Sequence, residues 1–80
     1  MDNLLIHQKD HILALVRDDK YEEALLLLNF VRPMWEQFDY LYKYEEIKRN
    51  MEERCREQAI EATHWKTEQK WRNIIQLIRA

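Results

Sequence analysis

Cys55 is the strongest nucleophile in this sequence, which contains no serine, and it lies between two arginines in the run Glu53-Arg54-Cys55-Arg56-Glu57. Neighbouring cations favour a thiolate, but acyl transfer also needs hydrogen-bond donors for the oxyanion. The interior of a helix offers no such backbone donors, and the chain has no glycine to build a phosphate-cradling loop. We therefore expect Cys55 to be a small packing residue and the protein not to be an enzyme.

Histidines and carboxylates offer two metal-binding patterns. His7 and His11 lie four residues apart on one helical face, but no third or fourth ligand accompanies them. Glu61 and His64 form a Glu-x-x-His element, as in di-iron carboxylate bundles, which need two such elements and two more glutamates. One copy per chain would require a dimer that turns a further glutamate inward, with Glu36, Glu45 and Glu46 as candidates. We expect no metal or other cofactor and keep Glu61 and His64 as an alternative.

The last segment mixes cations with aromatic rings, as nucleic-acid-binding surfaces do. Residues 62–80 carry a net charge of +3, whereas residues 1–31 carry −3 and residues 32–61 carry −2. The acidic remainder of the chain would repel phosphate groups. Nucleic-acid association is therefore a less favoured alternative, and it would use Lys66, Lys70, Arg72 and Arg79.

The elements that position these residues are predicted to be helices, because good helix formers dominate and glycine is absent. Apolar spacing predicts a helical hairpin over residues 3–31, with one helix reaching about residue 17, a turn at Asp18-Asp19 and a second helix over 20–31. The run Ala24-Leu25-Leu26-Leu27-Leu28, followed by Phe30 and Val31, makes the second helix apolar nearly all round. Such a helix lies at the centre of a fold or in an interface.

Pro33 suits the first position of a helix, and Arg32 before it is biased away from helical geometry. We therefore predict a long helix over residues 33–62, with a narrow apolar seam between charged flanks that is typical of a coiled coil. Beyond residue 65 the apolar residues lie on the opposite side of an ideal helix from this seam. Since Thr63 and Thr67 can each cap a helix, we predict a break there and a short C-terminal helix over 67–79.

The hairpin resembles that of tetratricopeptide repeats, through its acidic turn and the run Lys20-Tyr21-Glu22-Glu23-Ala24-Leu25. The resemblance covers about a third of the chain. The family's glycine at the helix contact is missing, Pro33 comes early, and no second copy follows, whereas such repeats need neighbours for stability. We interpret the segment as a generic helical hairpin.

The sequence as a whole predicts one all-α domain over residues 1–80, a helical hairpin packed on a long third helix with a short C-terminal helix. A chain of 80 residues with a single cysteine cannot gain stability from an internal disulfide. We expect intermolecular helical packing, as a homodimer or in a complex with another protein. The lone thiol suggests the cytoplasm, and no apolar run is long enough for a membrane span.

These features favour a protein-binding module: an adaptor, a chaperone-like partner or an inhibitor of a larger assembly. Large aromatic side chains that one short bundle cannot enclose are its candidate contacts. They are Trp35, Phe38, Tyr40, Tyr42, Tyr44, Trp65 and Trp71.

Overall fold

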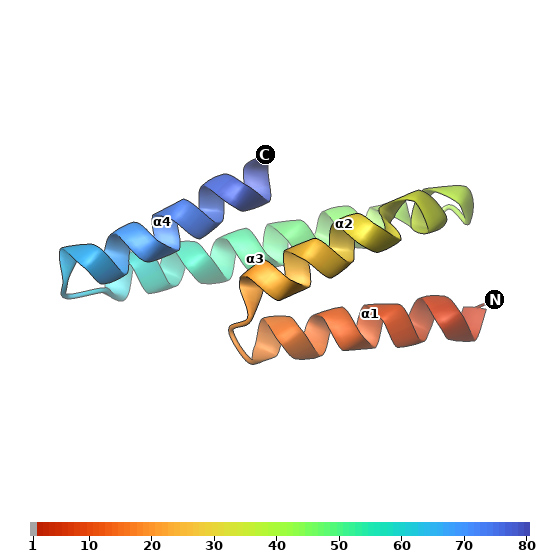
Figure 1. Ribbon diagram of the computed structural model, residues 1–80, viewed down its shortest axis with the longest axis horizontal. Coiled ribbons are helices and arrows are strands. Elements are labelled where there is room, and N and C mark those ends of the chain that lie inside the picture. The colour runs from red at the N-terminus through yellow and green to blue at the C-terminus, as the bar shows by residue number, and fades with distance from the viewer. Residues whose placement is uncertain (1) are drawn as a thin grey trace. The chain divides into compact units, whose positions relative to one another are not determined.

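The computed structural model describes residues 2–80, which form four helices (Figure 1): α1 (Asp2–Arg17), α2 (Tyr21–Gln37), α3 (Leu41–Glu61) and α4 (Trp65–Arg79). Within these residues there is no strand, so the prediction of an all-α fold is confirmed. None of the four helices combines the length and apolarity needed to cross a bilayer. The chain divides into two compact units, Met1–Ile47 and Lys48–Ala80, and α3 contributes to both. The prediction of a single domain stays a prediction.

The first unit is built on the predicted hairpin, in which α1 runs antiparallel beside α2 (Figure 1). Apolar residues three, four or seven apart face each other across it, and Ile12, Ala24, Leu28 and Trp35 have no exposed surface. Gln8 makes two hydrogen bonds across this core: its Oε1 accepts from the indole Nε1 of Trp35 at 2.9 Å, and its Nε2 donates to the sulfur of Met34 at 3.6 Å. A buried indole N–H needs such an acceptor, which explains a glutamine within the apolar stripe of α1.

Helices α1 and α2 end in the same way, each with an aspartate in left-handed geometry. Asp19 has φ 61° and Asp39 has φ 55°. After α1, the N–H of Lys20 bonds to the carbonyl of Leu15 at 2.9 Å, and that of Asp19 to the carbonyl of Val16 at 3.0 Å. Asp39 and Tyr40 repeat this pattern after α2. Both ends are Schellman motifs, and aspartate takes the place that glycine usually fills.

The predicted boundary at Pro33 is wrong. Helix α2 continues through Pro33 to Gln37, so residues 33–37 belong to the hairpin and the long helix begins at Leu41. Val31 and Trp35 lie four residues apart, on either side of Pro33, and both are buried on the same face. Packing of that face outweighs the roughly 3 kcal/mol that a proline costs within a helix. The chain turns instead at Asp39, where the second Schellman motif ends α2.

The start of α3 completes the first unit. Tyr44 is almost fully buried, and its hydroxyl donates to Oδ1 of Asn29 on α2 at 3.1 Å. The guanidinium of Arg32 lies 5.2 Å from the centre of the Tyr44 ring. This part of α3 therefore packs on the hairpin, as the sequence predicted for its third helix.

The second unit contains the rest of α3 and α4, which lie side by side (Figure 1). The seam residues Met51, Cys55 and Ala59 are buried, as are four residues of α4: Trp71, Ile74, Ile75 and Ile78. The predicted break is confirmed, although α3 ends at Glu61 and α4 begins at Trp65. His64 caps α4 in place of the expected threonines, because its extended backbone lets Nδ1 accept a hydrogen bond from the N–H of Lys66 at 3.1 Å.

Candidate functional site

Three of the seven aromatic residues predicted to contact a partner belong to the core. Trp35 has no exposed surface, Tyr44 is 3% exposed and Trp71 is 9% exposed. These side chains are held by packing inside their own units, and their contact with a partner stays a prediction. The sequence indicated large apolar side chains correctly, but it did not indicate which side of each helix would be covered.

The other four predicted aromatics reach solvent to different degrees. Tyr40 is half-buried, and its ring lies edge-on to Trp35, with the ring centres 5.0 Å apart. Tyr42 is 64% exposed and makes a similar edge contact with Tyr40 at 5.5 Å. Phe38 is 38% exposed. Trp65, at the start of α4, is 69% exposed and stacks on His64 at 6.1 Å. Phe38, Tyr40 and Tyr42 belong to the first unit, and Trp65 belongs to the second.

The most exposed large apolar side chain of the described residues is one that the sequence prediction missed. Phe30 is 81% exposed, and Leu26, one turn earlier on α2, is 73% exposed. Pro33 is exposed on the same line. We call Leu26, Phe30 and Pro33 the α2 ridge. It lies on the side of α2 opposite the core face formed by Ala24, Leu28, Val31 and Trp35.

Acidic side chains dominate around this ridge. Glu22 and Glu23 are exposed in the first turn of α2, one turn before Leu26. The first unit as a whole contains ten acidic and five basic residues, a net charge of −5. The α2 ridge is therefore an apolar strip in negatively charged surroundings.

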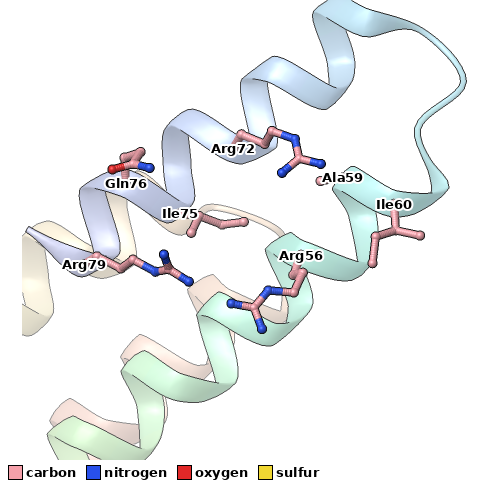
Figure 2. Close-up of a pocket in the computed structure, with 7 residues that line it drawn as sticks. All are labelled: Arg56, Ala59, Ile60, Arg72, Ile75, Gln76 and Arg79. Atoms are coloured by element: carbon pink, nitrogen blue, oxygen red, sulfur yellow. The ribbon is translucent and has the colours of Figure 1, made fainter.

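A groove of about 160 Å³ lies between α3 and α4 in the second unit (Figure 2). Arg72 and Arg79 extend from α4 toward α3, with Ile75 between them. Arg56 lines the groove from α3, next to Ala59 and the 74% exposed Ile60; Gln76 completes the lining. We call this the arginine groove. The second unit contains eight basic and five acidic residues, a net charge of +3.

Each arginine of the groove has a carboxylate partner. Glu52 accepts a hydrogen bond from Nε of Arg79 across the two helices, and its other oxygen lies 3.8 Å from Nη2 of Arg56. The hydrogen bond from Arg79 is the main cause that lowers the pKa of Glu52 below its ordinary value. Arg72 donates from Nε to Glu68 at 2.9 Å, one turn away on α4. Glu52 thus ties the end of α4 to α3.

The four basic residues of the nucleic-acid alternative do not form one patch. Lys66 and Lys70 lie one turn apart on one line of α4, whereas Arg72 and Arg79 line the groove. At about 100° per residue, these two pairs occupy roughly opposite sides of the helix. Lys66 and Lys70 lie over the rings of Trp65 and Trp71, at 5.7 and 5.0 Å from the ring centres.

The metal and nucleophile patterns of the sequence take other roles. Glu61 is the last residue of α3 and His64 caps α4, so they are not consecutive ligands on one helix. In residues 2–80, no three histidine, cysteine or acidic side chains gather where they could hold a metal ion. Cys55 has no exposed surface, so its sulfur cannot reach a substrate in solution.

Comparison of the chain with protein-family models, curated proteins and solved structures found no match.

Proposed function

We propose that this protein is a non-enzymatic protein-binding module of the cytoplasm, which contacts its partner through the α2 ridge. The observation that carries the proposal is the exposure of Leu26 and Phe30 on a helix whose opposite face is fully packed. Isolated exposed apolar side chains are common, but two adjacent large ones and a proline on one line form a continuous strip. Such strips are typical of helix-mediated protein contacts.

Substitution of Phe30 should remove the ridge contact without destabilising the core of the first unit. Burial of a large apolar side chain contributes about 1.5–3 kcal/mol, so Phe30→Glu should weaken a complex at least tenfold. Exposed substitutions usually change folding stability by less than about 0.5 kcal/mol. The variant should therefore keep its helical circular dichroism spectrum and its unfolding midpoint.

Affinity capture from the source cell tests the proposal with three baits. The wild-type protein and Leu77→Glu, a matched apolar-to-acid change at a 52% exposed position of α4 away from the ridge, should retain the same partner. Phe30→Glu should lose it. If all three baits retain the same proteins, or if none retains a protein, the cell's own copy of this chain included, the α2 ridge does not bind a protein partner.

A second candidate function, association with nucleic acid, has support in the second unit. Its net charge is +3, and the exposed ring of Trp65 offers a stacking surface beside Lys66. Retention on single-stranded nucleic acid should fall with rising salt and disappear in a Lys66→Glu, Lys70→Glu double variant, which removes both cations on the Trp65 side of α4. Retention that the double variant leaves unchanged would exclude this basic surface.

A further inference from the structure

The α2 ridge and the arginine groove are matched in size. Phe30 projects from the first unit and is 81% exposed, whereas the groove in the second unit is a hollow of about 160 Å³. An apolar cavity of roughly 150 Å³ accommodates a benzene ring. The aliphatic side chains of Ala59, Ile60 and Ile75 line the groove. The ring of Phe30 therefore fits the groove in size and can contact these three aliphatic side chains.

The charges around the two surfaces are also complementary. The ridge belongs to a unit with a net charge of −5, and the groove to a unit with +3. Glu23 precedes Phe30 by seven residues, and Arg72 and Arg79 are also seven residues apart, so both intervals are about 10 Å along a helix. A guanidinium beside an aromatic ring adds a favourable cation–π contact.

The present partners of the arginines do not prevent such binding. Glu68 and Glu52 pair with Arg72 and Arg79 at solvent-accessible positions. Exposed ion pairs contribute little to stability, so Arg72 can exchange Glu68 for a carboxylate of a second acidic surface, and Arg79 can bind a second carboxylate while it keeps Glu52. The planar guanidinium has donors for more than one carboxylate.

We propose that the α2 ridge of one copy of this chain binds the arginine groove of a second copy, with Phe30 seated between α3 and α4. This inference rests on the proposed function and names the partner of the ridge. The two surfaces differ, so the contact is heterologous: each copy brings one ridge and one groove. Opposite charges steer the copies together, and salt weakens the association.

Mixing two inactive variants tests this pairing. Phe30→Glu destroys the ridge and leaves the groove intact, whereas Ile60→Glu places a carboxylate in the groove at an exposed position and leaves the ridge intact. Sedimentation equilibrium from micromolar to millimolar concentration should show that the wild-type protein associates and that each variant does so at least tenfold more weakly. An equimolar mixture should regain a species of two chains with one of each variant.

Two further variants make the result specific. Arg72→Glu should behave like Ile60→Glu, including recovery on mixing with Phe30→Glu, because it removes a cation of the groove. Leu77→Glu adds the same charge as Phe30→Glu outside both surfaces and should associate like the wild-type protein. Circular dichroism of each variant identifies any that does not fold, and the other groove variant then decides the outcome.

Several results would overturn the pairing. A wild-type protein that stays monomeric throughout has no such contact. If the wild-type protein associates but the mixture of variants does not, identical surfaces meet in the complex. If association survives in both groove variants, the ridge binds a surface other than the arginine groove. The proposed function is judged separately by capture of a different protein. If Phe30→Glu loses that protein while the wild-type chain is monomeric, self-pairing fails and the proposed function stands.

Discussion

Gln8 is the residue whose replacement tests the first unit most directly. Its side-chain oxygen accepts the hydrogen bond of Trp35, which has no exposed surface. Gln8→Leu keeps a side chain of similar length but leaves the indole N–H buried without an acceptor. Such an orphaned donor costs about 1–3 kcal/mol, part of which the more apolar leucine offsets. We expect a loss of about 1–2 kcal/mol in the free energy of unfolding.

The loss is large enough to measure by urea unfolding followed by far-ultraviolet circular dichroism. In a domain of this size, each 1 kcal/mol corresponds to a shift of about 4–8 °C in Tm. Gln69→Leu is the matched control. Gln69 is exposed on α4 and donates to the exposed Asn73, so we expect its replacement to change the free energy of unfolding by less than about 0.5 kcal/mol.

A double-mutant cycle separates the hydrogen bond from the loss of packing. Trp35→Phe removes the donor, so Gln8→Leu should cost less in that background than in the wild-type protein. The difference between the two costs should be at least about 0.5 kcal/mol. If Gln8→Leu leaves the free energy of unfolding unchanged, or lowers it equally in both backgrounds, the hydrogen bond between Gln8 and Trp35 does not stabilise the core.

Three substitutions probe other features. The pKa of Glu52 is lowered in the folded state, chiefly by the hydrogen bond from Arg79. The ionised carboxylate therefore contributes fully to folding stability above the ordinary glutamate pKa of about 4.3, and this contribution is lost as the pH falls through the lowered pKa. Glu52→Gln should therefore flatten the fall in urea midpoint on acidification, and an unchanged pH profile would contradict the role of Glu52 in tying α4 to α3. Pro33→Ala should raise the free energy of unfolding by about 1–3 kcal/mol, because proline lies inside α2; a lower urea midpoint would show that proline is favoured there. Asp39→Gly should raise the free energy of unfolding by about 1 kcal/mol, because glycine adopts the positive φ of this position without a steric cost. A lower Tm would show instead that the aspartate side chain stabilises the turn.

Local patterns predicted the helices well, but the boundary at Pro33 depended on packing. The hairpin turn at Asp18-Asp19 and the break before α4 were predicted because apolar periodicity ends or changes side there. The proline signal was real, since proline does disfavour a helix. It was outweighed because Trp35 and Val31 need the same helical face, and their shared burial appears only once α1 is in place.

The candidate contacts were harder to predict for a similar reason. Helix α2 is apolar on nearly every side, so its sequence does not indicate which side α1 and α3 cover. Aromatic type was a poor guide: Trp35 and Tyr44 are large enough to fill the core, and each finds a hydrogen-bond partner there. Leu26 and Phe30 could be recognised as a surface only after Leu28 and Trp35 were placed inside.

The position of Phe30 is also the strongest reason to connect the fold with binding. At an exposed site in the middle of a helix, phenylalanine favours helix formation less than glutamine, lysine or glutamate does. Its ring contributes little to the core, because 81% of the residue is exposed. Neither local propensity nor packing within the first unit accounts for an aromatic side chain there. A contact that covers Phe30 together with Leu26 would account for both residues, which is why the ridge, rather than the buried tryptophans, is the place to test for a partner.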